Sequence, residues 1–150
     1  MRGSKLVLAA LATGTLALAA VVGPGSGTAS GEARPGPCAI ERRDGQSVAS
    51  WMKAFIRCAV DKWAVPGGAA KAICIARAES GLNPKATSSD GKYLGLFQHD
   101  ADAWPDRYKA WTKESWRLDP SALSGRTNTI VTIRMVNADG WGPWSGVQGC

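Results

Sequence analysis

The N-terminal segment decides how much of this chain can take part in a folded domain. Two basic residues among the first five precede an apolar run at residues 6–22, and small residues follow it. A basic start, an apolar stretch of this length and a small residue at Ala29 or Ser30 are typical of a cleaved secretory signal peptide. We therefore predict that residues 1–30 are removed, that no membrane span remains, and that the protein is secreted to the extracellular space or the cell wall.

The remainder of the 150-residue chain is the size of one small domain. Removing the leader takes Lys and Arg from 18 to 16 against 12 acidic residues, which leaves a net charge of +4. Residues 31–47 are rich in Gly and Pro, so we expect a short N-terminal segment there and one domain over residues 48–150. The positive charge suits an anionic partner such as nucleic acid, an acidic membrane or a wall polymer and does not choose among them, and the scattered basic residues also fit an ordinary solvated surface; we expect no nucleic-acid partner. No internal repeat or heptad is visible, and we expect a monomer.

All four cysteines lie in the predicted mature chain, at Cys38, Cys58, Cys74 and Cys150. An even number of cysteines in an exported protein predicts two disulfide bonds, with three connectivities possible. Antiparallel helices could bring Cys58 near Cys74 and leave Cys38 for Cys150. The cysteines lack C-x-x-C spacing and the chain has a single histidine, so we predict no metal site.

Helical periodicity begins shortly before residue 50. Apolar residues recur at Val48, Met52, Phe55 and Ala59. This spacing predicts an amphipathic helix with Ser47 as its N-cap. Residues 69–80 are rich in alanine and predict a second helix, with Gly81 placed to end it in the left-handed conformation.

Turn-forming residues dominate the next segment, residues 83–96. The Asp90-Gly91 pair predicts a β-hairpin or ordered loop there. Residues 100–116 suit short helices, whereas residues 127–136 fit either a strand or a helix. The expected fold class is therefore mainly α, with helices around a cleft and a minor β element after the second helix.

Glu79 is the residue that most suggests chemistry. Together with Ala72, Ile75 and Ala76 it completes one face of the second helix, so a carboxyl group stands on an apolar stripe in the last helical turn. Burial and the partial negative charge of the helix end both favour the protonated carboxyl. A protonated acid near neutral pH suits glycosidic bond cleavage. The alternative is an ion pair with Lys62, Arg77 or another base.

Residues 79–86 (ESGLNPKA), Ser88, Gly91 and the run at 95–98 (GLFQ) resemble the catalytic segment of the lysozyme-like superfamily, especially the soluble lytic transglycosylase domain. The resemblance implies a lysozyme-like fold with Glu79 as the catalytic acid and base. It further implies that Ser88 and Gly91 shape the loop behind Glu79 and that Gln98 lies in the sugar-binding cleft. The spacing before Asn128 departs from the family pattern.

The closing stretch at 140–144 (GWGPW) is similar to the ending of small actinobacterial relatives. Trp141 and Trp144 could stack on sugar rings, or they could form a lid on the core. Tyr93 stands where animal lysozymes carry an aspartate, and we also expect it to contact substrate.

A second carboxylate is therefore missing from its usual place in the family. Asp100 sits where goose-type lysozymes have an aspartate, and Asp90 lies in the preceding loop, so either could activate a water molecule. Asp100 is also a suitable N-cap for residues that follow it.

The resemblance implies a lytic transglycosylase that acts on peptidoglycan strands with no metal or cofactor. Glu79 would cleave the bond between N-acetylmuramic acid (MurNAc) and N-acetylglucosamine (GlcNAc) and form a 1,6-anhydro ring. Two alternatives stay open: a hydrolysing muramidase that uses Glu79 with Asp90 or Asp100, and a non-catalytic wall-glycan-binding protein.

Overall fold

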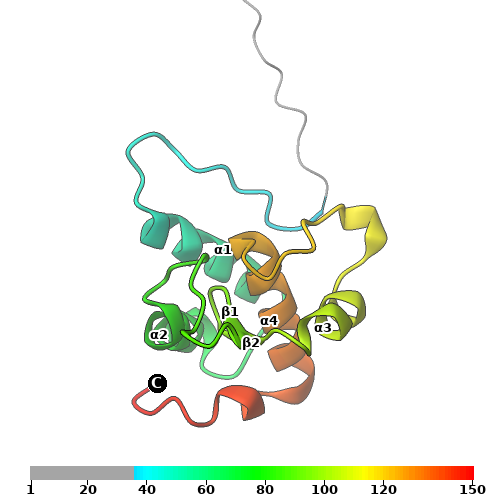
Figure 1. Cartoon of the computed structure of the whole chain (residues 1–150). Coiled ribbons are helices and arrows are strands. Elements are labelled where there is room, and N and C mark those ends of the chain that lie inside the picture. The colour runs from blue at the N-terminus through cyan, green and yellow to red at the C-terminus, as the bar shows by residue number, and fades with distance from the viewer. Residues whose placement is uncertain (1–35) are drawn as a thin grey trace, which may run out of the picture. The chain divides into compact units, whose positions relative to one another are not determined.

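The computed structural model describes residues 36–150, so the predicted signal peptide lies outside the described residues. The described part contains helices and one small antiparallel sheet (Figure 1). In chain order the elements are α1 (Val48–Lys62), α2 (Gly68–Ser80), β1 (Tyr93–Leu94), β2 (His99–Asp100), α3 (Trp104–Trp111), the 3-10 helix η1 (Glu114–Trp116), α4 (Gly125–Asp139) and the 3-10 helix η2 (Gly142–Trp144). The prediction of a mainly α fold with a minor β element is confirmed.

Helix α1 begins where the sequence predicts. The Ser47 hydroxyl accepts a hydrogen bond from the Ser50 backbone N–H at 3.2 Å, which satisfies one of the N–H groups left free at a helix start. The helix buries Met52, Phe55, Ile56 and Ala59. Val48, which the same periodicity placed on this face, is instead 38% exposed in the first turn.

Helix α2 also agrees with its prediction. It ends at Ser80, and Gly81 follows in the left-handed conformation with φ of 62°. The Gly81 N–H donates to the carbonyls of Ala76 and Arg77, so the last turn of the helix is closed. Glu79 is thereby fixed in the final turn.

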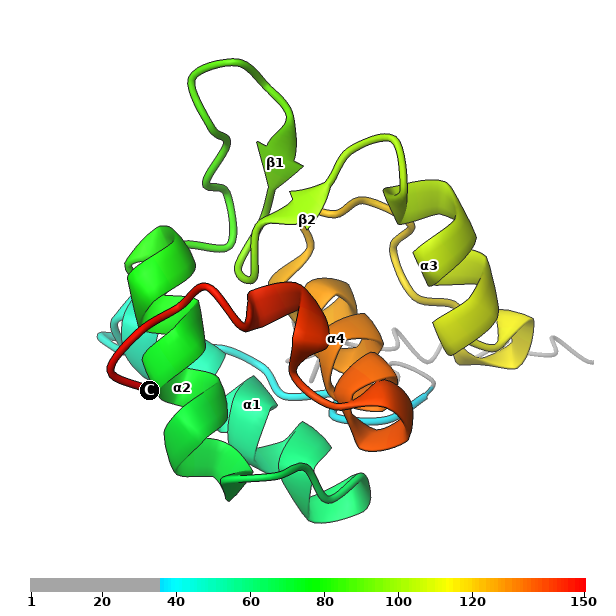
Figure 2. The same ribbon diagram turned by 90° about the horizontal axis from the view of Figure 1, so that it is seen from below.

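Helix α4 includes residues 127–136, for which the sequence fits either a strand or a helix. It packs against α1 and α3, while α1 also packs against α2 (Figure 2). Eight of its fifteen residues are buried, from Thr127 to Ile133 without a break and again at Val136. A helix buried on most sides loses the one-sided apolar spacing by which helices are recognised, which explains the ambiguity.

The β element is built differently from the predicted hairpin. Strands β1 and β2 pair antiparallel around a turn at residues 95–98. Asp90-Gly91 lies in a separate chain reversal one step earlier, whose two sides meet in an isolated bridge between Thr87 and Leu94. The Asp-Gly signal therefore marks a real turn, but the paired strands belong to the next one.

Two disulfide bonds join the four cysteines, Cys38 to Cys58 and Cys74 to Cys150. The predicted pairing of Cys58 with Cys74 and of Cys38 with Cys150 is therefore wrong. Apolar side chains occupy the buried faces of α1 and α2, and both helical cysteines lie at partly buried positions beside them. There they meet other segments: Cys58 joins the segment before α1, and Cys74 joins the C-terminus, which runs back beside α2 in Figure 2.

Within residues 36–150, no helix has both the length and the apolar character needed to cross a bilayer.

Candidate active site

The carboxyl group of Glu79 stands at the end of a buried apolar row. Ala72, Ile75 and Ala76 on the same face of α2 are each at most 1% exposed, and Glu79 itself is partly buried. Burial raises the pKa of Glu79 above its ordinary value of 4.5, because removal of water disfavours the charged form. The partial negative charge of the helix C-terminus acts in the same direction.

Glu79 has no paired base in the part of the chain that the structure describes. Among the described residues its carboxyl forms neither an ion pair nor a hydrogen bond, so the proposed pairing with Lys62 or Arg77 is absent. A carboxyl with a raised pKa and no cation beside it can hold a proton and release it to a bound molecule.

Ser80, the next residue, ties the end of α2 to the turn at residues 95–98. Its hydroxyl lies 2.7 Å from the Leu96 carbonyl oxygen and 3.0 Å from that of Ala76. The two parts of the motif that the sequence singled out, the Glu-Ser pair and the GLFQ run, are therefore in direct contact.

The fully buried side chain of Asn128, on α4, holds the turn at residues 95–98 by hydrogen bonds. Its side-chain oxygen accepts from the Phe97 N–H at 3.0 Å, and its amide donates to the Ala122 carbonyl at 2.8 Å. Gly95 has φ of 81°, and a Cβ there would lie 2.1 Å from the Ala122 oxygen and 2.4 Å from Asn128 Nδ2. Only glycine fits at this position without movement of the backbone.

Asn128 received no role from the sequence, because several other polar residues share its helix and nothing in their order marks it as buried. Once buried, its side chain requires hydrogen-bond partners, and an amide offers both a donor and an acceptor.

Gln98 braces the same turn. Its backbone has φ of 49°, and its side-chain amide donates to the carbonyls of Gly95 at 2.8 Å and Ala86 at 3.3 Å. The side-chain oxygen accepts no hydrogen bond from the described residues. The side-chain nitrogen of Gln98 therefore holds the loop.

Ser88 and Asp90 lie in the exposed loop before β1, and Tyr93 is the first residue of that strand. The Ser88 hydroxyl donates to the Asp90 carboxylate and accepts from the Tyr93 N–H. The Asp90 carboxylate also accepts from the Lys92 N–H. These hydrogen bonds lower the pKa of Asp90, the one from Ser88 most, so this carboxylate stays ionised. Tyr93 is 41% exposed.

Asp100 caps the turn that leads into α3. Its carboxylate accepts from the backbone N–H groups of Asp102 at 3.0 Å and Ala103 at 3.1 Å. The capping alternative for this residue agrees with these contacts, although α3 itself begins later, at Trp104. Neither Asp90 nor Asp100 is hydrogen-bonded to Glu79.

The two C-terminal tryptophans lie in the core. Trp141 is 9% exposed and its indole N–H donates to the Pro66 carbonyl, while Trp144 is 5% exposed and donates to the Phe97 carbonyl. Their rings meet edge to face, with centroids 5.9 Å apart. These contacts agree with the core-lid alternative and leave little ring surface for a sugar.

His99, the single histidine of the chain, is fully buried at the start of β2. Its Nδ1 lies 2.9 Å from the Arg107 guanidinium, which can only donate, so Nδ1 accepts. The Thr132 hydroxyl donates to the Asn128 carbonyl and therefore accepts from His99 Nε2–H at 2.7 Å. Burial first, and then the Arg107 charge, lower the pKa of His99 to about 3.

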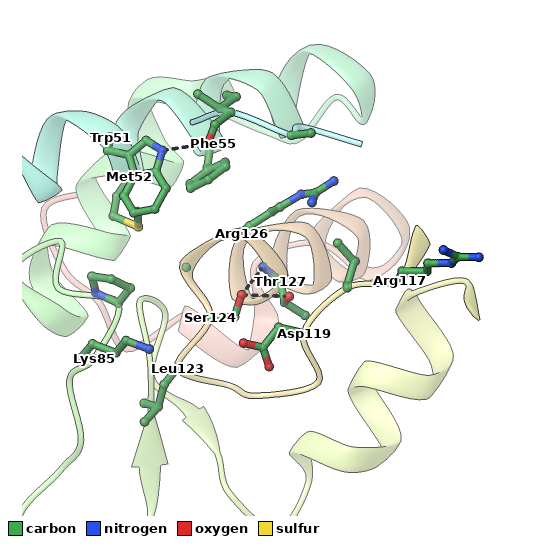
Figure 3. A pocket seen from close by; sticks show the side chains of 15 residues that line it. Trp51, Met52, Phe55, Lys85, Arg117, Asp119, Leu123, Ser124, Arg126 and Thr127 are labelled. Carbon is green, nitrogen blue, oxygen red and sulfur yellow. Dashed lines mark hydrogen bonds between the residues drawn. The ribbon is translucent and has the colours of Figure 1, made fainter. Parts of the chain in front are cut away.

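Glu79 does not line the cavity between α1 and α4 or the hollow beside Trp63 in the described part of the chain. A cavity of about 360 Å³ lies between α1, the start of α4 and the segment at residues 117–119 (Figure 3). A more open hollow of about 590 Å³ is lined by Trp63, Trp116 and three neighbours. Among residues 36–150, no three His, Cys, Asp or Glu side chains gather closely enough to hold a metal ion.

No family model matches this chain, and no curated protein or solved structure matches it.

Proposed function

We propose that this protein is a secreted lytic transglycosylase that cleaves the β-1,4 bond between MurNAc and GlcNAc in peptidoglycan. The observation that carries the proposal is the state of Glu79, a partly buried carboxyl with a raised pKa and no cation paired with it among residues 36–150. Such a group holds a proton at a pH where an exposed glutamate has lost it.

In the proposed reaction, Glu79 serves in both halves. The protonated carboxyl gives its proton to the glycosidic oxygen as the bond from C1 of MurNAc breaks, and the GlcNAc part leaves with a free hydroxyl. The acetamido oxygen of MurNAc stabilises the positive charge that develops at C1. The MurNAc C6 hydroxyl then bonds to C1 and returns its proton to the Glu79 carboxylate, so no water is consumed.

The surroundings of Glu79 support a fixed position for this carboxyl. Gly81 closes the last turn of α2, and Ser80 binds the Leu96 carbonyl. The GLFQ turn is held in turn by Asn128 and by the Gln98 amide. An acid held in a fixed position acts at a high effective concentration on the glycosidic bond of a bound substrate. The net charge of +4 predicted for the mature chain favours approach to an acidic wall polymer.

The state of the two aspartates favours a single-acid mechanism over hydrolysis. Each of them accepts two hydrogen bonds on Oδ1 from groups of its own loop. Those bonds fix the direction of each carboxylate toward its own loop, whereas a base that activates water must direct a lone pair at that water.

Product analysis tests the proposal. Purified peptidoglycan is incubated with the protein, with Glu79→Gln and with Glu114→Gln, and the soluble fragments are examined by mass spectrometry. Glutamine preserves the shape of the side chain and removes its proton. Glu114 is an exposed acid in η1 and supplies a control with the same change of charge. We expect 1,6-anhydromuramyl ends from the wild type and Glu114→Gln, and none from Glu79→Gln.

Three other outcomes would contradict the proposal. Fragments that carry one added water and a reducing end identify a hydrolysing muramidase. Pelleting with the wall without release of fragments identifies a glycan-binding protein. Undiminished release by folded Glu79→Gln shows that another residue is the proton donor.

A further inference from the structure

The backbone of Phe97, in the turn at residues 95–98, is held by two side chains from distant parts of the chain. Its N–H donates to the Asn128 side-chain oxygen at 3.0 Å, and its carbonyl accepts from the Trp144 indole N–H at 2.9 Å. Phe97 is fully buried and Trp144 is 5% exposed. Because a buried carbonyl without a hydrogen-bond partner is costly, Trp144 determines where this carbonyl can lie.

Trp144 belongs to the segment from Trp141 to Cys150, which we call the C-terminal strap. Two anchors hold the strap. The Trp141 indole N–H donates to the Pro66 carbonyl at 2.7 Å, just before α2 begins. A disulfide bond joins Cys150 to Cys74 within α2, and the strap runs back beside that helix (Figure 2). Because Trp144 lies between these anchors, its position is set with respect to α2.

The Trp144 ring is packed so that its N–H has a fixed direction. The ring meets Phe97 and His99 edge to face, with centroids 6.2 and 5.4 Å away. It meets the Trp141 ring in the same way at 5.9 Å. A buried ring with these neighbours cannot turn its N–H away from the Phe97 carbonyl without displacing them.

The other side of the turn leads back to the same helix. The Ser80 hydroxyl, in the last turn of α2, lies 2.7 Å from the Leu96 carbonyl oxygen. Leu96 and Phe97 are consecutive residues, so α2, the turn and the C-terminal strap form a closed chain of contacts that begins and ends on α2. Glu79 directly precedes Ser80. A displacement of the turn would therefore move the end of the helix that carries the acid.

We propose that Trp144 is a positioning residue for Glu79. Its indole N–H fixes the turn at residues 95–98, and the turn fixes the end of α2 through Ser80. Because Trp144 is buried, it acts through the turn and not by contact with a sugar. The effect on catalysis rests on the proposed use of Glu79 as the acid that cleaves peptidoglycan.

The test compares Trp144→Phe with Trp141→Phe. Both changes shorten a buried tryptophan of the strap and remove an N–H bonded to a backbone carbonyl, but only Trp144 is bonded to the turn. On soluble peptidoglycan strands, Trp144→Phe should lower kcat at least about tenfold and change KM less than about twofold, because the acid is misplaced while substrate contacts remain. Trp141→Phe should keep kcat within about twofold. Equal losses of kcat in the two variants overturn the proposal.

A carbon-13 NMR titration of the Glu79 carboxyl gives a readout that needs no activity. Loosening of the turn admits water, so the midpoint should fall toward 4.5 in Trp144→Phe and stay at the wild-type value in Trp141→Phe. An unchanged midpoint in Trp144→Phe overturns the positioning role, even where the wild type cleaves peptidoglycan. A lowered midpoint in Trp144→Phe supports that role, and a wild type without cleavage then refutes the proposed function alone.

A double-mutant cycle tests the route through Ser80. Trp144→Phe should lower kcat and the Glu79 midpoint much less in a Ser80→Ala background than in the wild type, whereas additive effects contradict the route. If circular dichroism shows that Trp144→Phe does not fold, 3-benzothienylalanine at position 144 takes its place, because it keeps the size of the ring and carries sulfur instead of the N–H. The same losses are then expected, and their absence overturns the proposal.

Discussion

The buried imidazole of His99 makes the stability of this protein depend on pH. The folded state holds the ring neutral with a pKa of about 3, whereas a histidine in the unfolded chain has its ordinary value of 6.5. Below pH 6.5 the unfolded chain takes up a proton that the folded protein does not. The contribution of the neutral His99 ring to stability is therefore fully present at neutral pH and is lost as the pH falls from 6.5 toward 3.

The size of the loss follows from the two pKa values. Each pH unit between them costs about 1.4 kcal/mol. Integrated from pH 7 to pH 5, His99 alone should lower the free energy of unfolding by about 2 kcal/mol, and by about 3 kcal/mol at pH 4. Glu79 acts with the opposite sign, because its raised pKa favours the folded state as the pH falls.

The measurement is urea unfolding, followed by circular dichroism, at pH 7 and pH 5 for the wild type and His99→Gln. Glutamine does not titrate, and the contributions of all other groups are common to both proteins. We expect the variant to be less stable at pH 7, because it loses the contacts to Arg107 and Thr132. Between pH 7 and pH 5, the wild type should lose about 2 kcal/mol more than the variant. Equal losses in the two proteins would refute the argument that the ring is held neutral.

Three further predictions concern the parts that hold the candidate site. Gly95→Ala should cost about 3 kcal/mol or more in urea unfolding, because the new Cβ meets the Ala122 carbonyl, whereas Gly91→Ala, also at positive φ but in open space, should cost about 1 kcal/mol. Asn128→Ala leaves two buried backbone groups without partners, so we expect a loss of about 2–4 kcal/mol by the same assay; a loss below about 1 kcal/mol would contradict the role of Asn128. Cys74→Ala/Cys150→Ala removes the second disulfide, which closes a loop of 76 residues, and should lower the free energy of unfolding by up to about 4.5 kcal/mol. Thermal unfolding against the wild type measures the loss. An unchanged unfolding midpoint would show that the bond does not form.

The sequence predicts best those features that depend on neighbours within one helical turn. The Ser47 cap, the Gly81 terminus and the buried row of Ala72, Ile75 and Ala76 are confirmed for this reason. Each is set by local backbone geometry and by the period of the helix, which the order of residues records directly.

Features that join distant segments could not be predicted in the same way. The disulfide pairing depends on where the segments that carry Cys38 and Cys150 pack. Cys38 lies 20 residues from its partner in α1, and Cys150 lies 76 residues from its partner in α2. Asn128 reaches the GLFQ turn over 31 residues of chain, and no periodicity marks that contact. The cavity draws its walls from several such segments, so its existence follows only from their packing.

The most direct test of the central proposal is a titration of the Glu79 carboxyl by NMR, with a carbon-13 label in the side chain and Glu79→Gln to assign the signal. The proposal requires a midpoint above 4.5, so that a protonated fraction remains in mildly acidic solution. A midpoint at or below 4.5 would mean that the carboxyl is ionised and solvated, and Glu79 could not be the proton donor.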